Sequence, residues 1–247
     1  MSGHSKWSTI KHKKGALDAK RGRIFTRLIR EITVAARAGG GDINGNARLR
    51  SAVAAAKEAN MPADNITRAI KKGTGELEGG TIEEVTYEGY GPGGVAVIVE
   101  TVTDNKNRTL PEIRHIFSKH GGNMAAANAV AWMFEKKGYF VVESKVAAED
   151  QLLELVLEAG AEDMRQDGEN QEIFTSPESF EAVKEALKRR SIPVASSELA
   201  MTPKTTTRAE GATARKVLNL IEALEDHDDV QHVWANFDID ESEMESS

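Results

Sequence analysis

The sequence contains no cysteine, six prolines and few aromatic residues. The absence of cysteine excludes disulfides, thiolate metal sites and cysteine nucleophiles, and it is typical of proteins from a reducing compartment. No apolar run approaches the roughly 18 residues that a membrane span requires, and Met1–Gly15 lacks the apolar core of a signal peptide. We therefore expect a cytoplasmic protein. The basic start also fits an organelle transit peptide, although such peptides are usually rich in serine and arginine.

The common catalytic and cofactor motifs are missing as well. Six histidines occur without an H-E-x-x-H pair, and the chain has no Walker sequence and no G-x-S-x-G elbow. Residues 89–94 match G-x-G-x-x-G, but a strand is expected to follow them, whereas a dinucleotide site needs a helix N-terminus there. The segment is therefore predicted to be a glycine-rich turn. We expect no catalytic residue, no metal and no cofactor, and hence a protein that is not an enzyme.

Charge is distributed unevenly along the 247 residues. The whole chain has a net charge of -7. Residues 1–72 hold 16 lysines and arginines against 5 aspartates and glutamates, a net of +11, so the rest of the chain has a net of -18. Such segregation is typical of a nucleic-acid-binding module attached to an acidic body. The alternative is a helical domain whose basic side chains only solvate its surface.

The basic segment is predicted to be a small helical domain. Residues 16–38 repeat apolar side chains at helical spacing with arginines on the opposite side, and the glycines at 39–41 end this helix. Residues 46–59 form a second predicted helix. A third begins at Pro62 and ends with two lysines before Gly73, a combination that helix termini favour.

From Thr81 onward the pattern changes to alternating β-branched residues mixed with helical segments, which predicts α+β domains with antiparallel-rich sheets. A helix at 110–120 is predicted to be capped by Thr109 and Glu112. The predicted strands of this region lie at 82–87, 95–103, 129–134 and 139–143.

The last predicted helix and strand, at 212–224 and 230–237, have no partners nearby in sequence. We therefore predict that they return to the sheet that begins near Thr81, around a self-contained insertion. The predicted organisation is a basic helical nucleic-acid-binding domain at 1–78, a discontinuous α+β domain at 79–143 plus 207–240, an inserted α+β domain at 144–206 and an acidic tail at 241–247. The fold class is multidomain α+β, with a small helical domain first and the third domain inserted in the second.

The strongest functional signal is a basic arm followed by a basic helix face. Each lysine or arginine that neutralises a phosphate releases condensed counterions, which gives affinity for nucleic acid without sequence specificity. Trp7 either stacks on a base or serves as a hydrophobic anchor. The predicted nucleic-acid-binding residues are Lys6, Trp7, Lys11, His12, Lys13, Lys14, Lys20, Arg21, Arg23, Arg27 and Arg30. No signature among them selects DNA over RNA.

A second candidate phosphate-binding segment lies between a predicted strand and a predicted helix. It consists of Asn105, Lys106, Asn107, Arg108 and Thr109. Basic side chains would lie there beside the free backbone N–H groups of a helix N-terminus, an arrangement that can hold a phosphate. The alternative interpretation is an N-capped polar loop without a ligand.

Motifs spread along nearly the whole chain resemble those of the YebC family. In the first half they are Gly3-His4-Ser5-Lys6-Trp7, Lys20-Arg21-Gly22-Arg23-Ile24-Phe25, Gly39-Gly40-Gly41-Asp42, the run from Tyr87 to Gly94, and the run from Asp104 to Thr109. In the second half they are Phe117-Ser118-Lys119 with Gly121-Gly122-Asn123, the run from Glu158 to Asp163, and Asp228-Asp229-Val230-Gln231. The resemblance implies three domains and a cytoplasmic bacterial protein of the kind described as a probable transcriptional regulator that binds DNA. It also implies a link to translation, because relatives act as an organellar translational activator and as ribosome-associated factors.

Charge, organisation and resemblance together predict a DNA-binding transcriptional regulator that contacts the phosphate backbone through its basic arm and helix. The alternative is a ribosome-associated translation factor that uses the same surface on ribosomal or transfer RNA. The acidic domains would then position the basic domain or recruit a protein partner. No membrane contact is expected.

Overall fold

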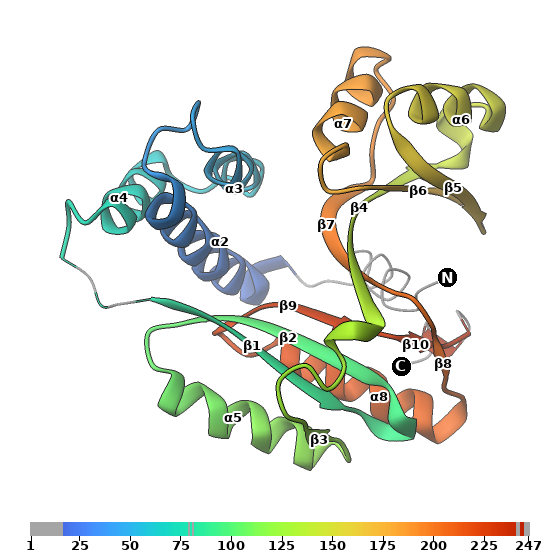
Figure 1. Cartoon of the computed structure of the whole chain (residues 1–247). Coiled ribbons are helices and arrows are strands. Elements are labelled where there is room, and N and C mark those ends of the chain that lie inside the picture. The colour runs from blue at the N-terminus through green and yellow to red at the C-terminus, as the bar shows by residue number, and fades with distance from the viewer. Residues whose placement is uncertain (1–16, 79, 81, 241–242, 245–247) are drawn as a thin grey trace. The chain divides into compact units, whose positions relative to one another are not determined.

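The computed structural model describes residues 17–78, 80, 82–240 and 243–244 (Figure 1). The chain forms two compact units. We call Trp132–Thr206 the insertion unit, and we call the chain before and after it the main unit. Among the described residues, no helix is both long and apolar enough to cross a membrane.

The helical domain of the main unit consists of α2 (Leu17–Gly39), α3 (Ala47–Glu58) and α4 (Ala63–Thr74). Apolar residues at helical spacing bury a common core that includes Ile32, Leu49 and Ile66. Asn46 caps α3, because its side chain accepts a hydrogen bond from the Leu49 N–H and donates to the Ala35 carbonyl. The predicted helices at 16–38 and 46–59 are confirmed over their described residues, and the third predicted helix, at 62–72, is confirmed except for its end.

The sequence predicts that the helix ends before Gly73, but Gly73 lies inside α4, at the place where α4 meets α2. A Cβ atom on Gly73 would lie 2.4 Å from the Thr33 carbonyl oxygen and 2.7 Å from the Ala36 Cβ. The residue that ends the helix is Gly75, whose φ of 82° is the left-handed conformation that favours glycine. The first glycine therefore permits close helix packing, and the second permits the turn.

The α+β domain of the main unit is built on a sheet with strand order β3-β1-β2-β9. Its strands are β1 (Glu83–Tyr90), β2 (Ala96–Thr103), β3 (Asn123–Met124) and β9 (Val230–Ala235), and every pairing is antiparallel. A short 3-10 turn, η1 (Pro92–Gly94), joins β1 to β2. The G-x-G-x-x-G segment is thus a hairpin turn, as predicted, and the pairing of β9 with β2 confirms the predicted return of the chain to this sheet.

Helices α5 (Lys106–Lys119) and α8 (Gly211–Glu225) cover the same face of this sheet (Figure 1). Alternate residues of the strands point toward them, so that Val97, Val99 and Val233 share a core with Ile113 and Phe117 of α5 and with the apolar face of α8. A small parallel pair, β8 (Thr207–Arg208) and β10 (Phe237–Asp238), closes the domain.

The insertion unit has a second antiparallel sheet, with strand order β5-β6-β4-β7. It contains β4 (Phe134–Glu143), β5 (Ala161–Asp167), β6 (Asn170–Thr175) and β7 (Ser196–Pro203), with α6 (Glu149–Glu158), α7 (Phe180–Arg189) and the short η3 (Ser144–Val146). The predicted start of the insertion at residue 144 is too late in the chain. It follows β4, but β4 pairs with β6 and β7 and therefore belongs to the sheet of the insertion unit. The whole chain is α+β, as expected.

The predicted strand at 129–134 is wrong, because the chain there forms the 3-10 turn η2 (Ala131–Met133) before β4 begins. The cause is Glu88, a buried residue of β1. Its carboxylate accepts hydrogen bonds from the backbone N–H groups of Asn128, Val130 and Ala131 at 2.6, 2.7 and 2.8 Å. These donors are thereby withdrawn from any strand ladder.

Candidate nucleic-acid interface

The basic face of α2 is the part of the predicted interface that the structure describes in detail. Arg23, Arg27 and Arg30 are spaced four and three residues apart, which places them on one side of the helix. The residues of the predicted arm, namely Lys6, Trp7, Lys11, His12, Lys13 and Lys14, lie outside the described residues. Lys20 and Arg21 lie in the first turns of α2, where the structure describes the backbone.

These three arginines face the end of α8 and the turn that leads to β9. We call this segment, which consists of Glu225, Asp226, His227, Asp228 and Asp229, the acidic corner. Arg23 pairs with Asp226 at 2.6 Å, and Arg30 pairs with Asp229 at 2.8 Å and donates to the Asp228 carbonyl. The arginine face of α2 that the sequence predicts to bind phosphates therefore meets carboxylates of the same chain.

Arg27 lies between these two ion pairs. Burial lowers the pKa of its guanidinium, while the nearby charges of Glu225, Asp226 and Asp228 oppose this effect. Its Nε is buried and has no hydrogen-bond partner among the described residues. Arg27 is thus held close to several carboxylates without a direct hydrogen bond at that atom.

Asp229 is the centre of the acidic corner and is 1% exposed. Oδ2 accepts hydrogen bonds from Arg108 Nη2 and Thr109 Oγ1, each at 2.6 Å, and from Thr103 Oγ1 at 3.1 Å, while Oδ1 faces Arg30. Burial raises the pKa of this carboxyl, but the bonds from Thr109 and Arg108 and the charge of Arg30 outweigh burial and lower it. Asp229 therefore remains an anion and joins the helical domain to the α+β domain.

The second candidate segment, residues 105–109, surrounds this anion. Asn105 caps α5 by accepting a hydrogen bond from the Arg108 N–H, so the capping box predicted for Thr109 and Glu112 is wrong. Thr109 lies inside the first turns of α5, where its hydroxyl contacts Thr103 and Asp229. Lys106 pairs with Glu83 at 2.9 Å, and Arg108 with Asp229. The anion that this segment holds is the chain's own Asp229 carboxylate, which the side chains of Arg108 and Thr109 contact.

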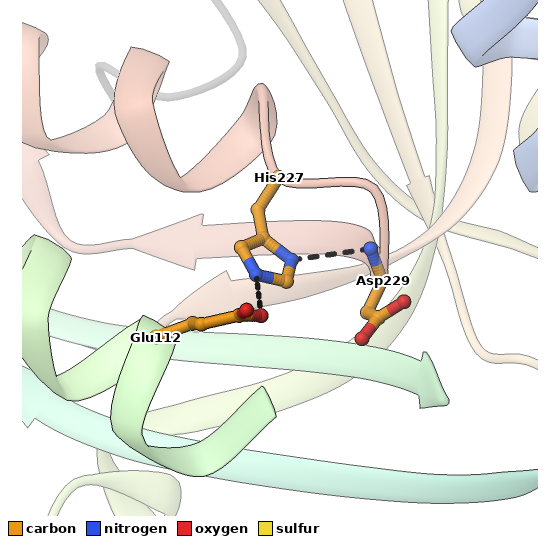
Figure 2. Close-up of side chains that lie close together, drawn as sticks. All are labelled: Glu112, His227 and Asp229. Atoms are coloured by element: carbon orange, nitrogen blue, oxygen red, sulfur yellow. Dashed lines mark hydrogen bonds and ion pairs between the residues drawn. The ribbon is translucent and has the colours of Figure 1, made fainter. Parts of the chain in front are cut away.

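Three groups beside this network have the chemistry of metal ligands: Glu112, His227 and Asp229 (Figure 2). The Asp229 N–H donates to His227 Nδ1 at 3.1 Å, so the imidazole proton is on Nε2, which lies 3.0 Å from Glu112 Oε2 and donates to it. Two arginines already compensate Asp229. Internal bonds therefore account for all three groups, and we assign no metal ion to them. Sequence reasoning missed His227 because its partner Glu112 is 115 residues away.

The acidic corner also borders an open groove of about 760 Å³ between the helical domain, α5 and the α8–β9 turn. Its walls carry both signs of charge, from Arg30 and Arg108 on one hand and from Glu112, Asp226 and Asp228 on the other. The mixture favours ion pairing across the groove over selective attraction of one charged ligand.

Exposed cations on the other helices of the helical domain were not among the predicted binding residues. Arg50, Lys57, Arg68 and Lys71 are exposed and have no carboxylate partner within the described part of the chain. The sequence signal that could have identified them is the charge of residues 1–72 itself, because arginines and lysines occur on α3 and α4 as well as on α2.

The fold and the charges define a class of protein, in which ion pairs join a basic helical domain to a discontinuous α+β domain that carries an inserted α+β unit. Residues 5–76 match the family model described as the TACO1/YebC protein N-terminal domain, and residues 82–237 match the TACO1/YebC second and third domain. The chain belongs to the TACO1/YebC family.

Relatives match over nearly the full length of both chains. A protein of Acidobacterium capsulatum, named "Probable transcriptional regulatory protein", is 60% identical over 243 residues, which cover 98% of each chain. A similarly named protein of Koribacter versatilis is 60% identical over 245 residues, 99% of this chain and 98% of that one. The crystal structure of the conserved hypothetical protein Aq1575 from Aquifex aeolicus is similar with a TM-score of 0.84 at 52% identity, covering 94% of this chain and 96% of that one.

Proposed function

We propose that the protein is a DNA-binding transcriptional regulator that contacts phosphate groups through the basic residues of its helical domain. The observation that carries the proposal is the net charge of +11 on residues 1–72, next to a remainder of -18. Counterion release by these cations supplies affinity for any phosphate backbone. The name of two relatives, probable transcriptional regulatory protein, supports DNA as the target.

We further propose that the protein acts in the cytoplasm by binding and not by catalysis. The clustered titratable side chains of the main unit, Glu112, His227 and Asp229, are bonded to one another and to arginines. A general acid or base needs a lone pair or proton directed at a substrate, and these groups direct theirs at each other. The acidic domains would then position the helical domain or present a surface to a protein partner.

A salt titration of binding tests the role of the basic arm. The test variant replaces Lys6, Lys11, Lys13 and Lys14 by Ala, and the matched control replaces Lys145, Lys184, Lys188 and Lys216 by Ala. Each lost phosphate contact lowers the slope of log affinity against log salt by about 0.9 on duplex DNA and about 0.7 on single strands. We expect the arm variant to lose about 3.6 units of slope on duplex DNA, about 0.9 for each of the four lysines, and the control to lose none. Equal losses would contradict the proposal.

Sedimentation of the native protein from lysate, with and without nucleases, tests the target. Association that is lost on DNase treatment and lies apart from ribosomes supports the transcriptional regulator. Comigration with ribosomes that survives DNase and is lost on RNase treatment would replace it by a translation factor that uses the same basic surface on ribosomal or transfer RNA.

A further inference from the structure

The acidic corner presents to α2 the kind of surface that a nucleic acid would present. Four of its five residues are acidic, and they are consecutive in the chain except for His227. Opposite them, Arg23, Arg27 and Arg30 form the helix face that the sequence predicts to bind phosphates. An arginine that holds a carboxylate in a hydrogen-bonded ion pair offers fewer N–H groups to a phosphate, so the two anions compete for it.

The two ion pairs of the acidic corner differ in how far their side chains are exposed to solvent. The Arg30–Asp229 pair is sheltered, with side-chain exposures of 19% and 1%, whereas the Arg23–Asp226 pair is open, with exposures of 40% and 52%. Open ion pairs contribute little to stability and weaken with salt, whereas a buried anion with several partners is costly to disrupt. Arg23 is therefore the cation that a polyanion releases at least cost, and its release also removes the charge of Asp226 from beside Arg27.

The connection between the helical domain and the α+β domain permits such an exchange. The two domains have separate hydrophobic cores, one built around Ile32 and Leu49 and the other around Phe117 and Leu218. Charged side chains link them outside these cores. Arg48, for example, joins Glu31 of α2 to Glu84 of β1 at 2.7 and 2.6 Å. Separation at the acidic corner therefore leaves both cores intact.

We propose that the acidic corner is an autoinhibitory mimic of a phosphate backbone, in which Asp226 pairs with Arg23 and the charges of Asp226 and Asp228 act on Arg27 until a nucleic acid displaces these carboxylates. This inference rests on the proposed function, because it assumes that the helical domain binds nucleic acid. It specifies in addition that binding requires the exchange of an internal anion for an external one, and that the outer carboxylates set the affinity.

The test uses a corner variant that carries both Asp226→Asn and Asp228→Asn. The control variant carries both Glu154→Gln and Glu158→Gln. Both variants remove two exposed carboxylates, but Glu154 and Glu158 lie on α6 of the insertion unit. Asp229 is left in place, so that the buried network persists, and equal thermal unfolding of the three proteins verifies this. The probes are a mixed-sequence duplex DNA and a single-stranded RNA of equal length, at low and at physiological salt.

We expect the corner variant to bind about two- to fivefold more tightly than the wild type at low salt, the effect of the one surface ion pair that Asp226 makes with Arg23, and the control to change less than twofold. Adding Arg23→Ala and Arg27→Ala to the corner variant should abolish the gain. Equal gains in the corner variant and the control, or no gain in the corner variant, would overturn the inference while the wild type still binds. If the wild type and both variants bind neither probe, the proposed function fails and the inference fails with it.

Discussion

Glu88 and Asp229 are buried carboxylates whose positions depend on hydrogen bonds from the rest of the chain. Burial raises the pKa of Glu88, but the three backbone N–H donors from Val130, Asn128 and Ala131 outweigh it and lower the pKa. The ionised form is thus the one that the fold requires. Since Glu88 belongs to the run from Tyr87 to Gly94, part of the family resemblance has a structural cause at this residue.

Replacement of Glu88 by Gln is expected to reduce the free energy of unfolding by about 1–3 kcal/mol at neutral pH, because an amide can accept fewer of the three bonds and adds an unmatched N–H group. A carboxyl group whose pKa is lower in the folded state than in the unfolded state stabilises the fold at pH values above the unfolded pKa. This contribution is lost as the pH falls toward the folded pKa. The difference between wild type and variant should therefore shrink below about pH 4.3. Urea unfolding at neutral and acidic pH measures both effects, with the exposed Glu58→Gln as control.

Replacement of Asp229 by Asn should cost more, about 3 kcal/mol, since it leaves Arg30 and Arg108 facing a neutral group in a buried network. Urea unfolding of the full chain measures it. The Asp226→Asn variant, which removes an open ion pair, is the matched comparison and should change stability by less than about 1 kcal/mol. A similar loss in the free energy of unfolding at the two positions would show that the burial of Asp229 does not determine its contribution to stability.

At the scale of elements, the contact between α2 and α4 depends on the absence of a side chain. Gly73→Ala should destabilise the protein by about 1–3 kcal/mol through overpacking against Thr33 and Ala36, although Ala is the better helix former by about 1 kcal/mol. Gly22→Ala in α2 is the matched control, because nothing lies within 4 Å of its added Cβ, and it should stabilise by about 0.5–1 kcal/mol. Thermal unfolding of the two variants should shift in opposite directions.

Most elements could be predicted from the sequence because their apolar residues repeat with the period of the element that they form. The start of α5 could not, since Asn105 and Thr109 are both suitable caps and only the tertiary bond from Thr109 to Asp229 decides between them. The segment 129–134 was missed for a similar reason, because a carboxylate from another strand takes its N–H groups. Local pattern fails where a distant side chain satisfies the backbone.

The same limit applies to the candidate interface. Helical periodicity correctly places Arg23, Arg27 and Arg30 on one side of α2, but periodicity does not say what that side faces. Arg30 donates a hydrogen bond to the carbonyl of Asp228, which is 198 residues away, and no pattern in the sequence around α2 predicts this contact. The role of these three arginines in nucleic-acid binding stays a prediction.

At the scale of the whole molecule, the insertion unit should fold without the rest of the chain. It has its own core, including Phe140, Leu152 and Val183, and a complete sheet. A fragment of residues 132–206 is expected to unfold in one cooperative transition, which circular dichroism at increasing urea concentration measures. A fragment without a cooperative transition would show that this core needs support from outside.

The pairing of β4 with β7 has a consequence for how the chain reaches its native state. These strands begin and end the insertion, and Phe134 lies opposite Pro203, so the insertion brings its own ends together when it folds. Ala96 and its hydrogen-bond partner Asn236 are 140 residues apart in sequence. Once the insertion is folded, the loop that must close before β9 reaches β2 is about half as long, which lowers the entropy cost of closure by about 0.6 kcal/mol. The inserted domain thus shortens the search that completes the domain around it.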